Sequence, residues 1–446
     1  MSHVSRPTTP PRVAPVDRSA WRFEPLSVPT EWVESYRPGG FHPIHPGDFL
    51  DQGRYMAVCK LGYGAFSTVW LAQDNQHSRL VAVKVARADA PPATKELQLH
   101  KLLTKSAWGR EPTMHVVMPR GDFIETGPNG DHRCLVFEPM GPSAGYVMEG
   151  MPEAFNDSYS LDEPSLSFPY AVSKKSLLKQ PLLGLDCLHD CRIAHGDVNT
   201  GNFLLCIRPM SSHDIEQLLK SSKQDGMTAP VRRIDGKQDP WAPRYLCIEQ
   251  PLKDWLSLDQ QLFARISDLG AAFTFDNPPP ADKCATPAAL RAPEIILNGT
   301  ISHKIDIWSL GCLIYEFLTG QLLFQISGLS FIPRECNDDD HLLQMIDTLG
   351  QMTPEVFSKW PRRGKYFDEH LQLIRSDVGL SEVAKGELVK GPNLEEAFRQ
   401  AMPDGMGDEE ATQVLALLRR ILQYEPSLRP STSELLENAW FQAIGE

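Results

Sequence analysis

The chain has 446 residues, of which 41% are hydrophobic, and this is enough to bury one large core or two lobes. Its 44 lysines and arginines against 57 acidic residues give a formal net charge of −13, which disfavours direct nucleic-acid binding and favours basic protein partners. Nine scattered cysteines without a CxxC pair indicate free thiols rather than a disulfide framework or a zinc site.

Residues 1–35 are rich in proline and predict a disordered tail. The tail has no apolar segment of the kind that secretory signals carry. Its arginines and hydroxyl residues weakly resemble a transit peptide, but the repeated prolines oppose a long amphipathic helix. We therefore expect a disordered tail rather than an organelle address.

The next elements alternate β-branched and polar residues. Residues 55–74 and 79–87 predict three β-strands, with a glycine turn between the first two. A helix is expected from about 93 to 105, and residues 135–141 predict a short buried strand.

The remainder is mainly helical. The spacing of leucines predicts helices over 170–190, 305–319, 340–349, 393–402, 408–423 and 431–440. The apolar run 305–320 is too short to cross a bilayer and holds two acids, so we expect no membrane anchor. Residues 207–262 have mixed charge and little periodicity and predict an inserted spacer, whereas 360–392 is polar and not assigned. The chain thus predicts an α+β fold with a small β-rich lobe at 36–140, a larger helical lobe at 141–446 and a ligand cleft between them.

The glycine turn holds Gly62 and Gly64. Glycines at these positions would let backbone N–H groups close over phosphates, although such turns also occur as plain hairpins. Lys84 lies on a predicted strand among valines and alanines, and Glu96 lies on the following helix. An unpaired ammonium among apolar residues would be costly, so we expect Lys84 and Glu96 to form an ion pair that directs the lysine to phosphates.

Three further polar residues follow in an order that suits phosphoryl transfer. Asp197 would orient a substrate hydroxyl, while Asn202 and Asp268 would hold a magnesium ion. Each alone could equally be an Asx turn or a helix cap. Together with Lys84 and Glu96 they favour a catalytic set.

With these residues in line, residues 36–443 resemble a eukaryotic protein kinase, which has a bilobal fold with a β-rich N-lobe and a helical C-lobe. The motifs that carry the resemblance are GxGxF, VAVK, a helix glutamate, HxDxxxxN, DxG, APE and a distant arginine. The resemblance implies that Glu294 pairs with Arg429 and that Asp306 braces the backbone of the loop around Asp197.

A finer resemblance is to the SR-protein kinases, the SRPK family of the CMGC group. RPGGFHPIHPGD at 37–48, LGYGAFSTVWLAQD at 61–74, DLG in place of DFG, the spacer and NDDDHLLQMIDTLG at 337–350 carry it. It implies a monomeric serine/threonine kinase that uses ATP and Mg²⁺, acts on Arg/Ser-rich proteins such as splicing factors, binds neither nucleic acid nor membrane, and resides in the cytoplasm, the nucleus or both.

The resemblance also implies which residues hold ATP. They are Leu61, Gly62, Gly64, Ser67, Val69, Ala82, Lys84, Phe137, Glu138, Met140 and Leu204. Acids that match Asp340 and Asp347 line a substrate-docking groove in the SRPK family. The two residues are seven apart, so they share one helical face, but a helix cap at Asp340 and an exposed Asp347 would explain them too.

The loop around Asp197 departs from most protein kinases. Asn199 stands where they carry a lysine, and Gly196 replaces the arginine that would bind a phosphate on the activation segment, in which Thr286 is expected to contact Asp197. Loss of the lysine leaves three readings: an active kinase, a pseudokinase that serves as an SR-protein scaffold, or a small-molecule kinase. A small-molecule kinase is opposed by RAPE, DIWSLG and Arg429, which belong to the peptide-binding lobe of protein kinases. An active kinase is favoured because all five catalytic residues are retained, and a serine kinase of other specificity is a variant of this interpretation.

Overall fold

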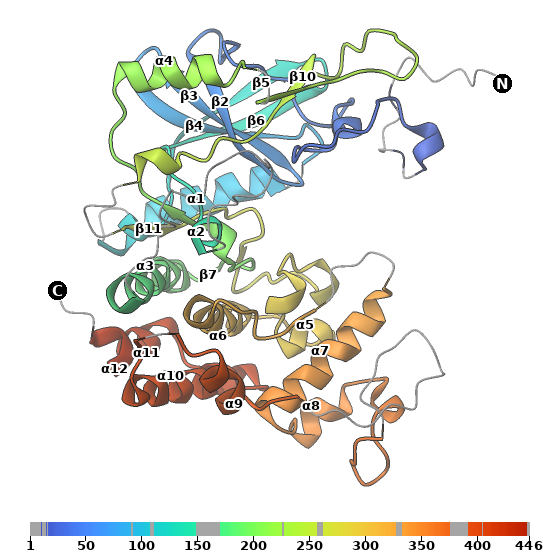
Figure 1. Cartoon of the computed structure of the whole chain (residues 1–446), viewed down its shortest axis with the longest axis vertical. Coiled ribbons are helices and arrows are strands. Elements are labelled where there is room, and N and C mark those ends of the chain that lie inside the picture. Colours follow the sequence, from blue (N-terminus) through green and yellow to red (C-terminus); the bar gives the residue numbers. More distant parts are fainter. Residues whose placement is uncertain are drawn as a thin grey trace. The chain divides into compact units, whose positions relative to one another are not determined.

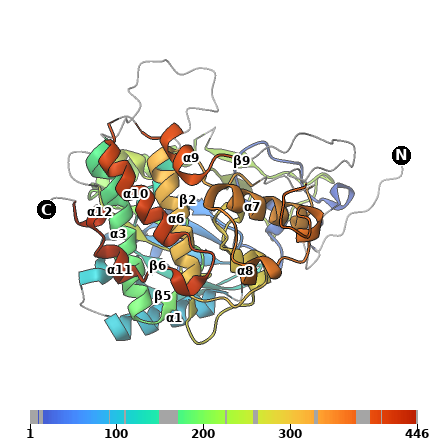
Figure 2. The same cartoon turned by 90° about the horizontal axis from the view of Figure 1, so that it is seen from below.

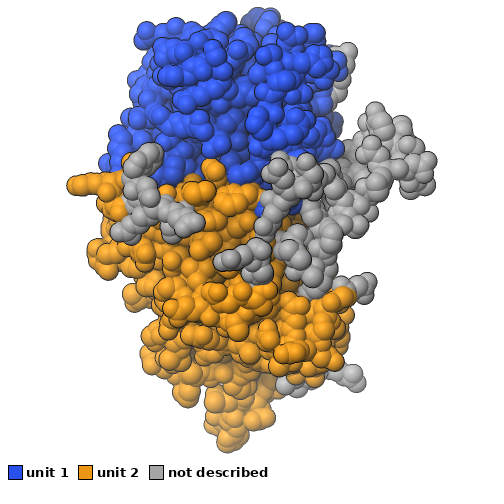
Figure 3. Space-filling view, turned by 90° about the vertical axis from the view of Figure 1, so that its left-hand side faces the viewer, with its two compact units in different colours: residues 1–101, 117–142, 205–262 blue, residues 102–116, 143–204, 263–446 orange. Residues whose placement is uncertain are grey.

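The computed structural model describes residues 10, 15, 17–90, 92–107, 111–148, 170–224, 227–256, 262–326, 332–374, 391–403 and 405–443. The chain forms two compact units, which Figure 3 colours separately. The first comprises residues 1–101, 117–142 and 205–262, and the second comprises 102–116, 143–204 and 263–446. Within the described ranges, no helix combines the length and the apolar character needed to cross a membrane.

The first unit is built on a six-stranded antiparallel sheet in the order β1-β2-β3-β4-β6-β5. The strands are β1 (Phe49–Leu50), β2 (Tyr55–Tyr63), β3 (Ser67–Asp74), β4 (Arg79–Ala86), β5 (Pro119–Gly127) and β6 (Gly130–Phe137). Val81, Val83 and Val85 of β4 belong to the core cluster of this unit. Because side chains alternate along a strand, Ala82 and Lys84 lie on the opposite face.

The three predicted strands at 55–87 are confirmed. The strand predicted at 135–141 corresponds to β6, but it begins earlier, at Gly130, and ends at Phe137. The predicted helix is α1 (Pro92–Ala107), which crosses the division between the units. Strand β5 was not predicted, because all of its residues are exposed or half-buried and no apolar alternation marks it.

The expectation of disorder for residues 1–35 is wrong for the residues that the structure describes from 17 onward. Two short turns, Arg18–Ala20 and Val33–Ser35, flank Arg22, whose side chain is 1% exposed. Its Nε donates to Glu34 at 3.0 Å and its Nη1 to Asp239 at 2.9 Å. A buried guanidinium needs such fixed partners, and here one of them lies more than 200 residues away in the sequence. The other part of the predicted tail, 1–9, 11–14 and 16, lies outside the described residues.

The aromatic residue next to Arg22 anchors the same segment. Phe23 packs in a buried cluster with Val33, Tyr36, Phe41 and Leu246. Lys60 of β2 is buried and forms an ion pair with Glu31 of this segment. Residues 17–36 are therefore part of the first unit.

The spacer at 207–262 also belongs to the first unit, not to the helical lobe in which the sequence placed it. It contains α4 (Ser212–Ser221) and a two-stranded ribbon of β9 (Thr228–Pro230) and β10 (Tyr245–Cys247). Leu218 of α4 packs against residues of β2 and β3, and α4 lies beside these strands in Figure 1. The amide of Gln250 donates to the carbonyl oxygen of Lys60 at 2.8 Å. Burial of this apolar face on the sheet explains why the insert joins the β-rich unit.

The second unit is helical. Its helices are α2 (Ala144–Met148), α3 (Tyr170–Asp190), α5 (Pro293–Ile296), α6 (Lys304–Thr319), α7 (Arg334–Leu349), α8 (Pro354–Ser358), α9 (Leu394–Gln400), α10 (Asp408–Ile421), α11 (Thr432–Leu436) and α12 (Ala439–Gln442). In Figure 2, α3, α6 and α10 lie side by side, and contacts of α6 with both neighbours confirm this. Nearly every residue of α6 is buried, which makes it the core of the unit.

Short strands frame the loops of this unit. They are β7 (Ile193–Ala194), β8 (Phe203–Leu205), β11 (Ala264–Ile266) and β12 (Phe273–Thr274), and they pair as β7 with β12 and β8 with β11.

Five of the six predicted helices correspond to single helices, although α7 begins at Arg334 rather than at 340. The sixth, predicted over 431–440, is the pair α11 and α12. Much of the unassigned stretch 360–392 lies outside the described residues.

Candidate active site

The turn between β2 and β3 carries the two candidate glycines. The amide of Gly64 donates to the carbonyl oxygen of Ser67 at 2.9 Å and closes the turn. Neither Gly62 nor Gly64 has a positive φ. An added Cβ at Gly64 would meet nothing within 4 Å, and one at Gly62 would meet only Glu249, at 3.8 Å. The fold itself therefore does not require glycine here, whereas a ligand that approaches the backbone closely would.

Lys84 and Glu96 form the predicted ion pair. The Nζ atom of Lys84, on β4, lies 2.9 and 3.0 Å from the two carboxylate oxygens of Glu96, on α1. Glu96 is almost fully buried, and the Lys84 side chain is 16% exposed. Burial of both partners fixes the ammonium on the face of β4 that is opposite to the valine core.

The candidate adenine residues of the first unit lie on adjoining strands. Ala82 on β4 is paired in register with Phe137 at the end of β6, and both are buried. The ring of His100 meets that of Phe137 edge-on at 5.8 Å. The other predicted residues are Leu61 and Val69, both half-buried, Ser67 at the start of β3, and Met140, which is buried. Leu204 lies on β8, in the second unit, and is half-buried.

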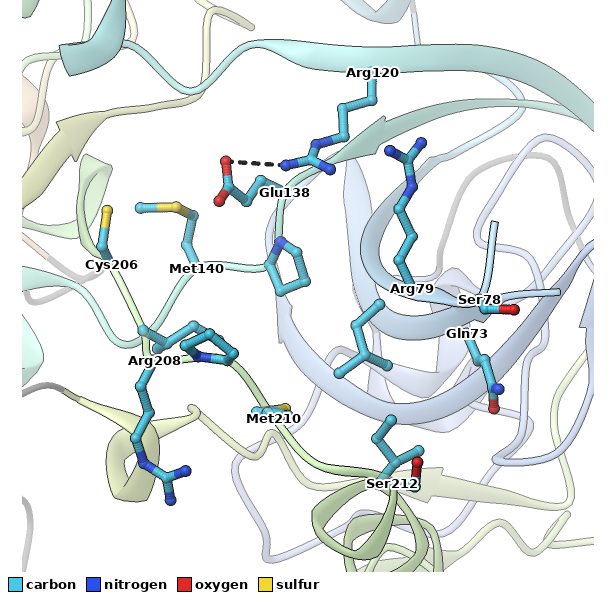
Figure 4. Close-up of a pocket in the computed structure, with 15 residues that line it drawn as sticks. Gln73, Ser78, Arg79, Arg120, Glu138, Met140, Cys206, Arg208, Met210 and Ser212 are labelled. Atoms are coloured by element: carbon cyan, nitrogen blue, oxygen red, sulfur yellow. Dashed lines mark ion pairs between the residues drawn. The ribbon is translucent and has the colours of Figure 1, made fainter. Parts of the chain in front are cut away.

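The segment after β6 also lines a separate pocket of about 470 Å³ in the first unit (Figure 4). Glu138 and Met140 line one side of it, and spacer residues such as Met210 line another. The carboxylate of Glu138 pairs with Arg120 at 3.2 Å, as the dashed line in Figure 4 shows. The lining includes neither the glycine turn nor Lys84, so this pocket is distinct from the predicted phosphate site.

In the second unit, the loop after β7 brings three of the singled-out side chains together. Asn202 Nδ2 donates to the Asp197 carbonyl oxygen at 2.8 Å and to its carboxylate Oδ2 at 3.2 Å. Asn199 Nδ2 donates to the same carbonyl at 3.1 Å and to Oδ1 at 2.9 Å. From the sequence, Asn199 was recognised only as the residue that replaces a lysine. An asparagine side chain often accepts a hydrogen bond from the backbone amide two residues later, as Asn199 does from Gly201, and this Asx-turn pattern could have predicted the bond.

Asp306, on α6, braces the backbone of this loop as predicted. Its carboxylate accepts from the amides of His195 at 2.7 Å and Gly196 at 2.8 Å, and from His189 Nε2 at 2.9 Å. Burial would raise the pKa of the Asp306 carboxyl, but the bonds and electrostatic attraction of His189, His195 and Gly196 outweigh burial and lower the pKa. The brace therefore stays ionised at neutral pH.

Burial raises the pKa of Asp197, and the charge of Asp268 raises it further. His195 and the bonds from Asn199 and Asn202 act in the opposite direction. Asp268 follows β11 and has a φ of +62°, which costs about 1–3 kcal/mol for a residue with a Cβ. Its Oδ1 accepts from the amide of Gly270 at 3.0 Å.

The two candidate metal ligands suit magnesium bound together with phosphates. Both described bonds of the Asn202 side chain start from Nδ2, which orients its carbonyl oxygen away from Asp197. Asp268 and Asn202 thus offer a carboxylate and an amide oxygen, which are hard donors. Among the described residues there is no group of three or more histidine, cysteine, aspartate or glutamate side chains that could hold an ion by themselves. A magnesium site here needs substrate oxygens, which is how Mg²⁺ is held in phosphoryl-transfer sites.

Two further contacts anchor the segment after Asp268. Thr286 Oγ1 donates to the carbonyl oxygen of Gly196 at 3.0 Å. The predicted partner of Thr286 is Asp197, and the structure places the hydrogen bond one residue earlier. Glu294 and Arg429 form the predicted pair, with two bonds of 2.6 and 2.8 Å. Both side chains of this pair are buried, so breaking it would leave an uncompensated charge.

The candidate docking acids lie on α7 and are half-buried. Burial raises the pKa of Asp340, whose Oδ2 accepts from Gln344 at 2.9 Å. Asp347 Oδ2 accepts from the amide of Gly391 at 3.0 Å. Asp340 lies inside α7 and Asp347 is half-buried, so neither fits the alternative of a helix cap at Asp340 and an exposed Asp347. Asp339, the residue before Asp340, is buried against Trp360 and Arg362 and is structural.

Known proteins resemble this chain over most of its length. A family model described as protein kinase domain matches residues 255–441. The serine/threonine-protein kinase SRPK of Physarum polycephalum is 30% identical over 438 residues, which cover 93% of this chain and 92% of that one. The protein kinase dsk1 of Schizosaccharomyces pombe is 24% identical over 95% of this chain and 87% of its own.

A shorter match and a solved structure agree with these. The human SRSF protein kinase 3 is 34% identical over 205 residues, 45% of this chain and 34% of the human protein. The crystal structure of the PF14_0431 kinase domain superimposes with a TM-score of 0.58 at 22% identity, over 90% of this chain and 98% of that domain, and supports the protein-kinase fold. With near full-length similarity to the Physarum kinase and the catalytic-loop geometry described above, the chain is a protein serine/threonine kinase and belongs to the SRPK family.

Proposed function

We propose that the chain transfers the γ-phosphate of ATP to serine residues of Arg/Ser-rich proteins. The observation that carries this proposal is the state of Asp197. Both of its carboxylate oxygens are bonded to amide donors, and the backbone on its N-terminal side is held by the buried Asp306. A fixed, acceptor-only group is what a serine hydroxyl needs in order to be aimed at a phosphorus atom.

In this reaction, the serine Oγ attacks the γ-phosphorus in line, the bond from phosphorus to the ADP oxygen breaks, and the hydroxyl proton passes to Asp197. Lys84, held by Glu96, would contact the α- and β-phosphates, and the glycine turn would supply backbone N–H groups. Asn202 and Asp268 would hold Mg²⁺, which neutralises phosphate charge when bound.

Charge supports a basic substrate. The net charge of −13 attracts arginine-rich chains, and Asp340 and Asp347 on one face of α7 offer carboxylates for guanidinium groups. The human relative bears the name SRSF protein kinase 3, which is consistent with the same substrate class. The alternative with a specific observation behind it is an SR-protein-binding pseudokinase, because Asn199 leaves the loop without the lysine charge.

Asp197→Ala tests the proposal. We expect phosphate incorporation into an Arg-Ser repeat peptide, measured with radiolabelled ATP and Mg²⁺, to fall by about 10²–10⁴-fold, since a positioned acid–base group contributes that much. Asp276→Ala, which removes an exposed carboxylate of the same unit, serves as the matched control and should leave the rate unchanged.

Equal incorporation by the wild type and Asp197→Ala would reject catalysis at this site. Peptide binding by the wild type without any transfer would identify the scaffold instead. A peptide in which lysine replaces arginine tests the substrate class, because lysine keeps the charge but cannot bond a carboxylate with the two parallel N–H groups of arginine. Equal efficiency on both peptides would indicate a serine kinase of other specificity.

A further inference from the structure

The carboxylate of Asp197 is held from two sides by two asparagines. Asn199 Nδ2 lies 2.9 Å from Oδ1, and Asn202 Nδ2 lies 3.2 Å from Oδ2. Each asparagine also donates to the Asp197 carbonyl oxygen, at 3.1 and 2.8 Å. Rotation of the carboxylate away from either amide would break a hydrogen bond to a charged group, which is stronger than one between neutral groups.

The orientation of the Asn199 amide follows from its surroundings. Its Oδ1 accepts from the backbone amide of Gly201 at 2.9 Å, and this bond caps the short turn Thr200–Asn202. Exchange of oxygen and nitrogen in this amide would place an oxygen against two oxygens of Asp197 and a nitrogen against an N–H group. The hydrogen-bond network therefore requires Nδ2 to face Asp197.

We propose that Asn199 is a positioning residue that holds the Asp197 carboxylate in its reactive orientation. This inference rests on the proposed function of Asp197. Asn199 stands where most protein kinases have a lysine, and it gives the Asp197 carboxylate a neutral donor that is itself fixed by Gly201. It holds the carboxylate in place but supplies no positive charge.

A double-mutant cycle tests the proposal. The four chains are the wild type, Asn199→Ala, Asp197→Ala and the double variant, assayed as full chains on the same Arg-Ser peptide. We expect Asn199→Ala to lower kcat by about 10- to 100-fold, because misplacement of a reacting group costs this much, with the KM for ATP unchanged. In the Asp197→Ala background, the same substitution should change kcat less than about twofold, because Asn199 acts only through Asp197.

Asn199→Ser separates positioning from capping. Serine retains an oxygen that can cap the turn at Gly201, but it is too short to bridge to Asp197. The Asn199→Ser variant should have the same unfolding temperature as the wild type, but its kcat should fall by as much as that of Asn199→Ala. The split between kcat and KM gives a second readout that does not need the weak Asp197→Ala variant, because both Asn199 variants should lower kcat and leave the KM for ATP unchanged.

Three results would overturn the proposal: a wild-type kcat in Asn199→Ala, an equal loss of kcat in both backgrounds, or a loss of kcat in Asn199→Ala that Asn199→Ser does not share. These differ from failure of the proposed function. If Asp197→Ala transfers phosphate as fast as the wild type, the catalytic role of Asp197 falls. If Asp197→Ala is slow while Asn199→Ala matches the wild type, only the positioning role falls.

Discussion

At the scale of single residues, Gly196 explains why the arginine of other protein kinases is missing. Its φ is +76°, and an added Cβ would lie 2.9 Å from the carbonyl oxygen of Ala271. A side chain there would be strained by the backbone and by the neighbouring strand. The segment before APE is instead held through Thr286, whose hydroxyl donates to the Gly196 carbonyl oxygen and whose own carbonyl oxygen accepts from Arg291 Nε at 3.1 Å. These contacts need no phosphate group to form.

Gly196→Ala and Gly320→Ala form a matched pair that tests this strain. Gly320, at the end of α6, has a similar φ of +71°, but a Cβ there would meet nothing within 4 Å. We expect Gly320→Ala to cost about 1 kcal/mol for the φ alone, and Gly196→Ala to cost about 2–4 kcal/mol, because overpacking is added. Urea denaturation measures both. An equal loss of stability in the two variants would mean that the loop accommodates the added methyl group without strain.

At the scale of elements, regular apolar periodicity decides what a sequence reveals. The strands at 55–87 and the helix α6 bury continuous or alternating apolar residues, and the sequence identified them. The edge strand β5 has little such pattern, and α4 is short, with Leu218 buried and Ile215 and Leu219 only partly buried, so neither was predicted. The placement of α4 on the sheet depends on tertiary contacts with β2, which no local pattern reports.

The helix α7 carries the proposed docking acids, and their neutral variants test it. Asp340→Asn and Asp347→Asn should each raise the KM for an Arg-Ser peptide by about 2- to 10-fold, the value of one partly exposed charged contact, while kcat and the KM for ATP stay the same. The increase should shrink at high salt, because salt screens such contacts. Glu369→Gln, which neutralises an exposed acid of the same unit, is the control. A KM unchanged by both aspartate variants would place docking elsewhere.

At the scale of the whole molecule, ordered motifs predicted the candidate site better than local structure predicted the fold. The contacts between Lys84 and Glu96 and between Glu294 and Arg429 are present as expected, because each kinase motif fixes both residue type and order. The hydrogen bond from Asn199 to the Asp197 carboxylate and the buried ion pairs of residues 17–36 were not predicted. They depend on side-chain geometry and on partners distant in sequence, such as Asp239 for Arg22.

Buried histidines in both units make stability depend on pH. Burial, and then repulsion from His132, lowers the pKa of His42 from 6.5 to about 4, and burial with Arg291 lowers that of His341 to about 3. The unfolded chain therefore binds more protons below pH 6.5, and stability falls as the pH drops toward 4, by about 1.4 kcal/mol per pH unit for each group.

Thermal unfolding between pH 7.5 and 4.5 measures this dependence. We expect the midpoint to fall over that range, and His341→Asn to make the fall less steep. His370→Asn, which changes a histidine whose side chain is 78% exposed, should leave the steepness as in the wild type. Identical slopes in all three chains would show that His341 is not held neutral by burial.

The order in which the first unit is assembled has a consequence for synthesis of the chain. Its sheet and N-terminal segment are translated early, but Asp239 and Leu246, which enclose Arg22 and Phe23, follow only after residues 143–204 of the other unit. While the helical sequence is being translated, the β-rich unit of the nascent chain therefore still lacks the residues that complete its core. We expect chaperones to bind the nascent chain most strongly until residue 262 has left the exit tunnel, and to bind it less once residues 207–262 have packed on the sheet.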